Sequence, residues 1–260
     1  MEQRNNNPEQ INYDNLHQIW DVSHENNSPV FRLRSAVLLG KIPEANAGES
    51  ALDAGCGTGF YSKALLQKNY KVDAFDLSSY AINLLPSKLS SEEAARFFPV
   101  VADIFTYKPS HNPYMVIVLS EVLEHIEDDH AALTTITRYL DESGQLIISV
   151  PIGPELYSID DQLSGHVRRY TMPELEKLIN SCGLRIVKKH YYGFPAIYIY
   201  MLWKRFFFKK ENYDKLVSNT SKSSSKSRIY QLISDILVYI DQCFLWVNRG
   251  VGTVLVVKKL

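Results

Sequence analysis

The chain carries one glycine-rich turn, Leu52-Asp53-Ala54-Gly55-Cys56-Gly57-Thr58-Gly59-Phe60, between an apolar segment that starts at Ala51 and a helical run over Tyr61–Leu66. A strand that runs through glycines into a helix exposes backbone N–H groups at the helix N-terminus, and no Cβ keeps a ligand away. The spacing is G-x-G-x-G and not the G-x-G-x-x-G of dinucleotide sites, and Asp53 would repel a pyrophosphate but attract an amino group and a sulfonium. The turn therefore predicts a cofactor cradle, with a plain strand-to-helix turn as the alternative.

Two more predicted strands end in an acidic residue. Lys71–Asp76 reads as the second strand and Phe98–Asp103 as the third. In a βαβ unit the acid at the tip of the next strand is placed to bind ribose hydroxyls, so Asp76 is the candidate for that contact. Acids at three successive strand ends, Asp53, Asp76 and Asp103, favour the cofactor interpretation of the turn.

The glycine spacing and the three acids resemble motif I and the following strands of the class I S-adenosylmethionine (SAM) methyltransferases, over about residues 30–192 and the C-terminal strand. The resemblance implies an α/β fold with a Rossmann-like, doubly wound sheet of seven strands. Their order would be 3-2-1-4-5-7-6, with the last strand antiparallel and helices on both faces. The cofactor-binding residues that the resemblance implies are Asp53, Gly55, Gly57, Gly59, Asp76, Asp103 and Ser120.

The remaining elements follow from periodicity and capping signals. The other predicted strands are Met115–Leu119, Gln145–Val150, Leu184–Tyr192 and Gly252–Lys258. Helical patterns cover Val30–Leu39 and Glu127–Leu140. Thr171-Met172-Pro173-Glu174 is a capping box that opens a further helix, and Gly183 ends it.

Length and composition limit the choice of protein class. With 260 residues, 45% of them hydrophobic, the chain suffices for one α/β domain with an insertion. Its three cysteines are scattered, which favours a reducing compartment over a disulfide framework. The Asn-rich N-terminus lacks a signal-peptide pattern, so we expect a cytoplasmic protein. The net charge of −1 gives no overall attraction to nucleic acid and argues against it as a partner.

We expect four regions along the chain: a polar N-terminal segment or lid (1–29), the SAM-binding core (30–193), an aromatic and basic helical insertion (194–250) and the C-terminal strand (251–260). In the family that the chain resembles, helices ahead of motif I often cover the cofactor pocket. Tyr13, Trp20 and His24 are therefore candidate lid residues. A helix that only packs on the sheet edge is the alternative.

The insertion combines aromatic residues with a local excess of positive charge. Residues 184–228 contain 11 Lys and Arg against two acids, an excess of nine positive charges. Ile229–Val247 is mostly apolar but contains Asp235 and Asp241, so it predicts an amphipathic helix and not a membrane span. The aromatics and lysines of Ile197–Lys210 suit a peripheral anchor on an anionic membrane surface. A cover for the substrate pocket or a contact with a partner protein fits the same pattern.

The chemistry is expected on two stretches at one end of the sheet. Directly after the fourth predicted strand comes Ser120-Glu121-Val122-Leu123-Glu124-His125. In a helical turn Glu121, Glu124 and His125 would fall at i, i+3 and i+4 and share one face that could hold a metal. A solvated acidic turn with one packed histidine is the alternative. The second stretch, Asp160–Thr171, carries His166 and should face the same end.

These stretches resemble the ubiquinone-biosynthesis O-methyltransferases and the small-RNA 3′-terminal 2′-O-methyltransferases. In those enzymes an E-x-x-E-H run and a later histidine bind a divalent cation. The resemblance implies that Glu121, Glu124, His125 and His166 bind Mg²⁺, Mn²⁺ or Zn²⁺.

The run Arg168-Arg169-Tyr170 departs from both groups. It resembles instead uncharacterised methyltransferases that are associated with cell-surface glycan synthesis. Arg168 and Arg169 could pair bidentately with an acceptor carboxylate or phosphate. Ion pairs with the nearby acids are the alternative.

The predicted activity is methyl transfer from SAM to an oxygen, with a divalent cation holding a catechol or vicinal diol, as in a sugar, a glycan or a quinone precursor. His125 or His166 could act as general base where it is not a ligand. The acceptor would be a small molecule or lipid-linked. Three alternatives remain open: a metal-independent N- or O-methyltransferase of a small acid or amine, a non-catalytic SAM-binding subunit docked on a membrane, and a nicotinamide dehydrogenase, which the glycine spacing disfavours.

Overall fold

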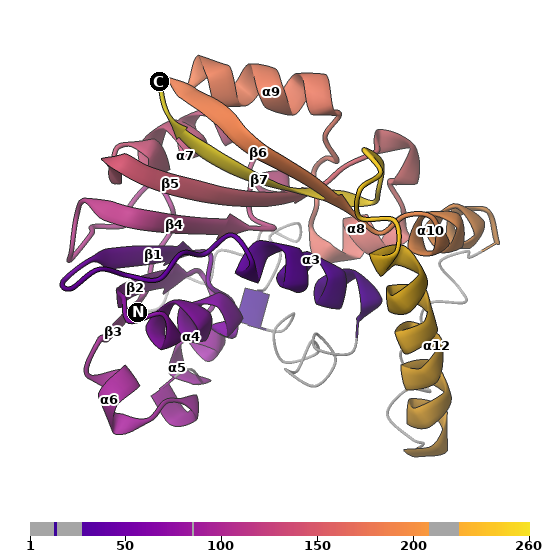
Figure 1. Ribbon diagram of the computed structural model, residues 1–260, viewed down its shortest axis with the longest axis horizontal. Coiled ribbons are helices and arrows are strands. Elements are labelled where there is room, and N and C mark those ends of the chain that lie inside the picture. The colour runs from indigo at the N-terminus through magenta and orange to yellow at the C-terminus, as the bar shows by residue number, and fades with distance from the viewer. Residues whose placement is uncertain (1–12, 15–27, 85, 208–223) are drawn as a thin grey trace, which may run out of the picture.

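A single seven-stranded sheet forms the centre of the molecule (Figure 1). The computed structural model describes residues 13–14, 28–84, 86–207 and 224–260. The strands are β1 (Ser50–Ala54), β2 (Lys71–Asp76), β3 (Phe97–Val101), β4 (Tyr114–Ser120), β5 (Leu140–Pro151), β6 (Leu184–Tyr192) and β7 (Gly252–Lys259). Their order is β3-β2-β1-β4-β5-β7-β6, and β7 runs antiparallel to both β5 and β6. The predicted fold class and strand order are confirmed.

Helices cover both faces of the sheet. They are α3 (Pro29–Leu39), α4 (Phe60–Gln67), α5 (Ser79–Leu84), α6 (Ser91–Ala94), α7 (Asp129–Thr137), α8 (Ile159–Ser164), α9 (Met172–Ser181), α10 (Ala196–Phe207) and α12 (Ser224–Gln242). One core unites α3, α4, α10 and α12 with one face of the sheet, through side chains such as Leu33, Leu65 and Val238. A second core packs α7 and α9 on the other face, through Leu133 and Ile179. The chain therefore forms three layers.

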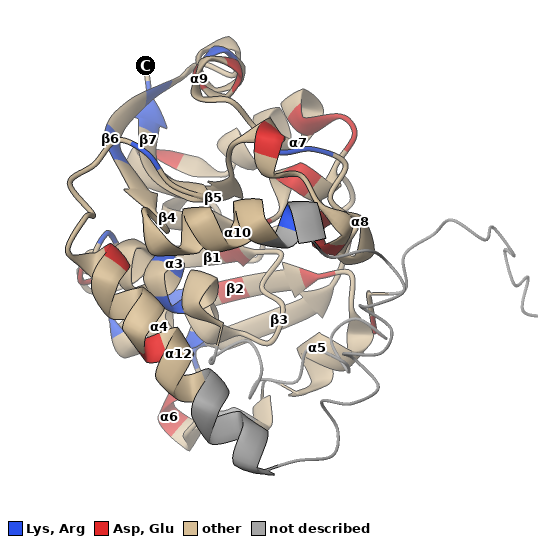
Figure 2. Ribbon diagram, turned by 90° about the vertical axis from the view of Figure 1, so that its right-hand side faces the viewer, with Lys and Arg blue, Asp and Glu red and all other residues tan. Residues whose placement is uncertain are grey.

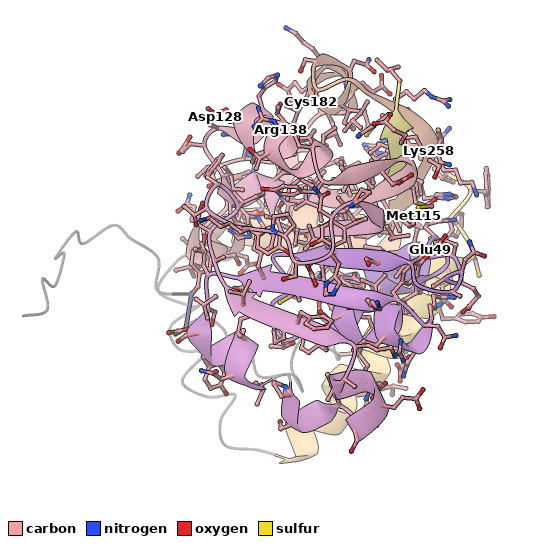
Figure 3. The ribbon with its side chains drawn as sticks, turned by 90° about the vertical axis from the view of Figure 1, so that its left-hand side faces the viewer. Glu49, Met115, Asp128, Arg138, Cys182 and Lys258 are labelled. Carbon is pink, nitrogen blue, oxygen red and sulfur yellow. The ribbon has the colours of Figure 1, made fainter. Side chains whose placement is uncertain are left out.

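The central strands bring the predicted site residues to one edge of the sheet. All five residues of β1 are buried, as expected for a parallel strand covered on both faces. Ala54 at the end of β1 pairs with Phe75 of β2 and Leu119 of β4, so these three strands end at the same level. The opposite edge carries Glu49, Met115 and Lys258 (Figure 3). The glycine turn, the tip of β2 and the stretch after β4 consequently meet at the carboxyl edge.

Three element boundaries differ from the sequence predictions. Strand β3 ends at Val101, so Asp103 lies two residues beyond it. Strand β5 begins at Leu140 and not at Gln145, because Leu140 pairs with Tyr114 before a register shift in β4. Helix α7 accordingly ends at Thr137. The capping box that opens α9 is confirmed.

The two helices of the predicted insertion pack on the core layer of α3. The carboxylate of Asp241 accepts hydrogen bonds from the backbone N–H groups of Ala196 (2.6 Å) and Ile197 (3.1 Å) and so caps the start of α10. Asp235 pairs with Arg32 of α3 at 2.6 Å. The amphipathic helix is confirmed, although α12 begins at Ser224 and ends at Gln242. Within the described part of the chain, every helix is too short or too polar to cross a bilayer.

Candidate active site

A cavity of about 570 Å³ opens at the carboxyl edge of the sheet. Most of the predicted site residues line it: Gly55, Gly57, Asp76, Asp103, Ser120, Glu121, His125 and His166. Asp53, Gly59, Glu124, Arg168 and Arg169 are not among the described residues that line it. Tyr13 and two side chains of α3, Phe31 and Arg34, complete the wall. Helix α3 therefore both packs on the sheet and faces the cavity.

The glycine turn depends on backbone conformations that L side chains rarely adopt. Gly55, Gly57 and Gly59 have φ values of 69°, 49° and 81°. A Cβ on Gly55 would lie 2.5 Å from Cγ2 of Val122. Gly59 is the N-cap residue that precedes α4. Gly55 thus lets the turn pack against Val122 at the edge of the cavity.

Asp76 stands on the cavity wall at the tip of β2. Its Oδ2 accepts a hydrogen bond from the Gly57 N–H, and its Oδ1 accepts one from the Ser78 N–H, both at 2.8 Å. The carboxylate therefore ties the glycine turn to β2. Its position beside the cavity fits the predicted contact with ribose hydroxyls.

Asp53 lies behind the turn and not on the wall. Its carboxylate is 1% exposed and accepts a hydrogen bond from the Ser62 hydroxyl at 2.6 Å. Burial raises the pKa of Asp53 to about 7 despite that hydrogen bond. The prediction that Asp53 contacts the cofactor is replaced by a positioning contact between β1 and α4.

Glu121 does not share a helical face with Glu124 and His125. Its φ of 55° and a hydrogen bond from its N–H to the Ser149 carbonyl end β4 in a turn, and the short 3-10 helix η2 (Leu123–His125) starts two residues later. The Glu121 carboxylate pairs with Arg34 at 2.9 Å. The prediction that all four residues form one ligand set is therefore wrong for Glu121.

Sequence reasoning did not assign Arg34 to the site. Burial lowers the pKa of its guanidinium, but Glu121 and Tyr61 outweigh that effect and raise the pKa above its usual value. Arg34 is thus a permanent cation on the wall. Its place three residues after Phe31, on a helix ahead of motif I, was the only signal for it in the sequence.

The structure brings Glu124, His125 and His166 together. One donor atom from each lies within 4.8 Å of the others. Glu124 Oε1 is 4.0 Å from His166 Nε2, and the two imidazole rings meet edge to face with centroids 4.8 Å apart. Glu124 is fully buried, and neither carboxylate oxygen has a hydrogen-bond partner among the described residues. Burial, and next the charge of Glu121, raise the pKa of Glu124 well above its usual value.

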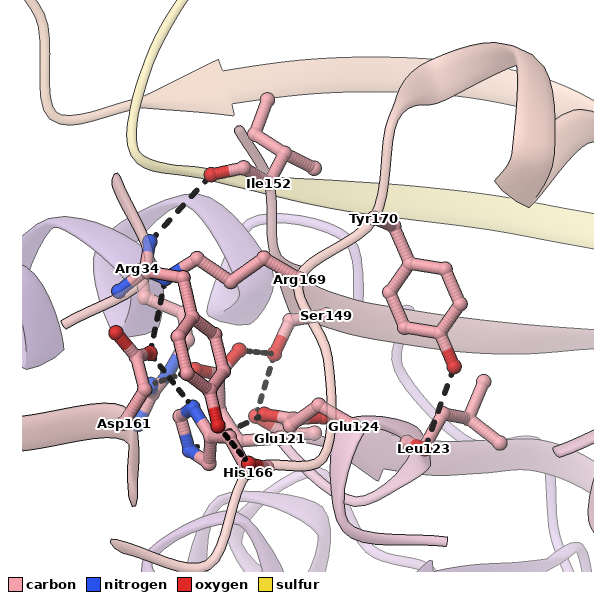
Figure 4. A network of polar contacts seen from close by, with 12 residues as sticks. Arg34, Glu121, Leu123, Glu124, Ser149, Ile152, Asp161, His166, Arg169 and Tyr170 are labelled. Carbon is pink, nitrogen blue, oxygen red and sulfur yellow. Dashed lines mark hydrogen bonds and ion pairs between the residues drawn. The ribbon is translucent and has the colours of Figure 1, made fainter. Parts of the chain in front are cut away.

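A second carboxylate fixes the orientation of His166 (Figure 4). Asp161 Oδ1 is 2.9 Å from His166 Nδ1 and 2.8 Å from Nε of Arg169. Burial alone would raise the pKa of Asp161, but the hydrogen bond from His166 and the charge of Arg169 outweigh it and lower the pKa. We assign the Nδ1 proton to this hydrogen bond, which leaves the Nε2 lone pair directed at Glu124.

The two predicted acceptor-binding arginines are engaged elsewhere. Arg169 is buried, donates to Asp161 and reaches the carbonyl of Ile152 at 3.4 Å. Arg168 pairs with Asp129 at 2.6 Å. Both arginines therefore form ion pairs with nearby acids, which was the alternative prediction.

A second cavity, of about 250 Å³, adjoins the first. Glu121, Ser164 and His166 line both of them. Tyr192 of β6 and Met201 of α10 also line the second cavity. His166 therefore contributes to the walls of both cavities.

Of the predicted lid residues, Tyr13 lies on the cavity wall. Its ring meets that of His125 edge to face, with centroids 6.2 Å apart. The adjacent Asp14, which the sequence analysis did not single out, accepts hydrogen bonds from the Ser78 hydroxyl (2.6 Å) and the Tyr80 N–H (3.0 Å). Trp20 and His24 lie outside the described residues.

Comparisons with known proteins identify the family. A family described as "Methyltransferase domain" matches residues 24–189. The malonyl-[acyl-carrier protein] O-methyltransferase 2 of Ilyobacter polytropus is 27% identical over 139 residues, which span 50% of this chain and 52% of that protein. The match thus covers about half the length of this curated relative.

Solved structures share the fold at low sequence identity. A SAM-dependent methyltransferase from Mesorhizobium loti aligns with a TM-score of 0.60 and 13% identity, over 90% of this chain and 100% of that one. The phosphoethanolamine N-methyltransferase 2 of Haemonchus contortus, solved with SAM, aligns with a TM-score of 0.61 and 15% identity, over 96% and 60% of the two chains. The chain belongs to the methyltransferase-domain family.

Proposed function

We propose that this enzyme methylates an oxygen and that Glu124, His125 and His166 hold a divalent cation that binds the acceptor. The observation that carries the proposal is the Glu124 carboxylate, which is fully buried and lacks a hydrogen-bond partner among the described residues. A buried carboxylate without a partner is costly, and it must either keep a proton or meet a positive charge. Two imidazoles within reach make a cation the natural partner.

The donor set fits some metals better than others. Two imidazoles and one carboxylate suit Zn²⁺ or Mn²⁺, whereas Mg²⁺ prefers oxygen ligands throughout. The hydrogen bond from His166 to Asp161 has the form that orients many metal-binding histidines, because it fixes the ring and its tautomer. The proposal therefore drops Glu121 from the four ligands that the sequence implies and ranks Mg²⁺ last.

Different residues of the site would bind the cofactor and the acceptor. The glycine turn and Asp76 would seat the cofactor, and the cluster would hold the acceptor opposite it. SAM supplies a methyl carbon on a sulfonium, and an acceptor oxygen displaces the neutral thioether from it. Aligning two reactants at near-attack geometry is worth roughly 7 to 11 kcal/mol. A bound cation would lower the pKa of a ligated hydroxyl, as metals do for water.

The acceptor that suits this arrangement has two neighbouring oxygens. A cation that holds the reacting hydroxyl by chelation needs a second oxygen beside it, as in a catechol or in the vicinal diol of a sugar or glycan. The cavity of about 250 Å³ next to His166 offers room for the rest of the acceptor. The printed name of the Ilyobacter relative is that of an O-methyltransferase, which supports an oxygen acceptor.

A metal-independent enzyme is the second candidate, and the Asp161–His166 pair favours it. A histidine oriented by a buried carboxylate is the arrangement of a general base, with Nε2 taking the acceptor proton. Glu124 would then stay protonated, in accord with its raised pKa. In this case neither neighbouring oxygens nor a cation would be needed.

One experiment distinguishes the metal-dependent from the metal-independent mechanism. Initial rates of methyl transfer from SAM are measured on catechols, sugar nucleotides and lipid-linked glycans, with and without a chelator. The proposal predicts that activity is lost with chelator and returns with Zn²⁺ or Mn²⁺, while the Kd for SAM is unchanged. Full activity in excess chelator would replace the proposal with the metal-independent mechanism.

A further inference from the structure

Helices α10 and α12 and the turn that follows α12 expose large apolar side chains. Trp246 is 78% exposed, Tyr239 71%, Ile199 62% and Leu232 61%. We call this surface the α10–α12 face, and its principal residues are Ile199, Trp203, Leu232, Ile236, Tyr239 and Trp246. Figure 2 shows α10 and α12 on the side of the molecule turned to the viewer, where they meet at one end and diverge. Exposed apolar patches of this kind mark interaction sites.

We propose that the α10–α12 face docks on an anionic lipid surface. The first support is that the acidic residues of the two helices serve the fold. Asp241 is buried and caps α10, and Asp235 pairs with Arg32 of α3. Helix α10 contains no acidic residue at all. The face is therefore apolar without nearby unpaired carboxylates in the described helices, and such carboxylates would be repelled by anionic lipid.

The second support is the positive charge at the end of α10. Arg205 lies in its last turn and is exposed, and Lys204 precedes it in the sequence. Lysine and arginine beside an apolar helix face attract anionic headgroups, and Trp and Tyr rings favour the headgroup level. The face thus has the composition of an interfacial surface.

The docking face shares a helix with the second cavity. Met201 of α10 lines that cavity, while Ile199 and Trp203 of the same helix are exposed. Docking would bring this wall of the cavity to the lipid surface, where an acceptor anchored in the bilayer is presented. The docking itself does not depend on the cation at Glu124, so either proposal can fail alone.

The test uses the full chain and vesicles of two compositions, phosphatidylcholine alone and phosphatidylcholine mixed with phosphatidylglycerol. We expect co-sedimentation with the anionic vesicles and much weaker binding to the neutral ones. The double variant Trp203→Ser, Trp246→Ser should weaken binding about tenfold or more, because it removes two large apolar contacts. The charge variant Lys204→Glu, Arg205→Glu should weaken binding to the anionic vesicles alone.

Matched controls exclude a general loss of structure. Val100→Ser with Leu260→Ser removes two exposed apolar side chains from other parts of the surface and should leave vesicle binding unchanged. The Kd for SAM should be the same in all variants, which shows that each is folded. A blue shift of tryptophan emission on anionic vesicles, in a Trp20→Phe background, would place Trp203 and Trp246 in the interface.

Two outcomes overturn the proposal. One is the absence of binding to anionic vesicles, or binding that both double variants retain. The other is a stable dimer in analytical ultracentrifugation that Trp203→Ser, Trp246→Ser dissociates, because the face would then be the contact between two copies of the chain.

Discussion

Two buried carboxylates near the carboxyl edge of the sheet differ in their hydrogen bonding. Asp76 is 8% exposed, and each of its oxygens accepts a backbone N–H at 2.8 Å. Glu124 is fully buried, and neither oxygen has a hydrogen-bond partner in the described part of the chain. The fold itself satisfies the first carboxylate and leaves the second without a partner.

Backbone N–H groups of the folded chain already bind the Asp76 carboxylate, whereas the Glu124 carboxylate needs a proton or a bound cation. The backbone donors around Asp76 come from the glycine turn and the end of β2, so the site forms whenever the sheet forms. Glu124 has the imidazoles of His125 and His166 within reach, and it becomes satisfied by binding a cation or by keeping a proton.

The largest effect is expected at the cluster. Glu124→Gln and His166→Ala should each lower kcat by at least about a thousandfold, about 4 kcal/mol in the barrier, because each removes a group that holds the acceptor. Arg168→Gln is the matched control, since Arg168 pairs with Asp129 and should leave kcat within about twofold. Steady-state rates are measured together with the Kd for SAM. A Glu124→Gln enzyme with near-normal kcat would refute the role of Glu124 as a cation ligand.

The pH dependence of the protein's stability tests whether Asp53 is protonated in the fold. Its pKa is raised from 3.8 to about 7, so the unfolded chain loses this proton at lower pH than the folded protein does. Stability should therefore fall as pH rises between those two values, by at most about 4 kcal/mol, and stay level above them. Asp53→Asn keeps an acceptor for Ser62 and should lose this dependence. Urea unfolding at about pH 5 and about pH 8 measures it, and parallel curves for the two proteins would show that Asp53 is ionised in the fold.

Asp76→Ala should weaken SAM binding by about 1.5 to 3 kcal/mol, the range for hydrogen bonds to a charged group. The reason is the loss of a carboxylate beside the cavity and of the acceptor for the Gly57 N–H. Calorimetry gives the Kd, and Asp53→Asn serves as the control because Asp53 lies behind the turn. An unchanged Kd for Asp76→Ala would remove it from the cofactor site.

The smallest effect is on stability. Glu124→Leu should raise the free energy of unfolding of the metal-free protein by about 1 to 2 kcal/mol, because it removes a buried polar group without a partner. Asp76→Ala should lower that free energy, because the N–H groups of Gly57 and Ser78 lose their acceptor. If both substitutions destabilise the protein equally, the two carboxylates do not differ in the way described here.

The sequence predicted the fold well because the information is local. The buried strand runs, the glycine turn and the capping box at Thr171 all act within a few residues, and the strand order came with the family resemblance. Strand ends were less well predicted. Asp103 was predicted to be the last residue of the third strand, but β3 ends at Val101. The pattern of polar and apolar residues does not show where the hydrogen bonding between strands stops.

The site was predicted only in part, because side-chain partners come from distant segments. The E-x-x-E-H spacing suggested a helical face, but the positive φ of Glu121 and its pairing with Arg34, 87 positions earlier in the chain, separate it from the cluster. Arg169 was assigned to the acceptor, yet the nearby Asp161 binds it. A pattern of spacing identifies which residue types are present but not which of them the fold has already paired.

Direct metal binding tests the central claim. The purified protein is stripped with chelator and titrated with Mn²⁺, and the bound fraction is followed by electron paramagnetic resonance. The account predicts one tight site per chain that Glu124→Gln and His166→Ala abolish and that Glu121→Gln keeps, because Glu121 pairs with Arg34. Equal Mn²⁺ binding in the wild type and Glu124→Gln, or no stoichiometric binding in the wild type, would contradict it.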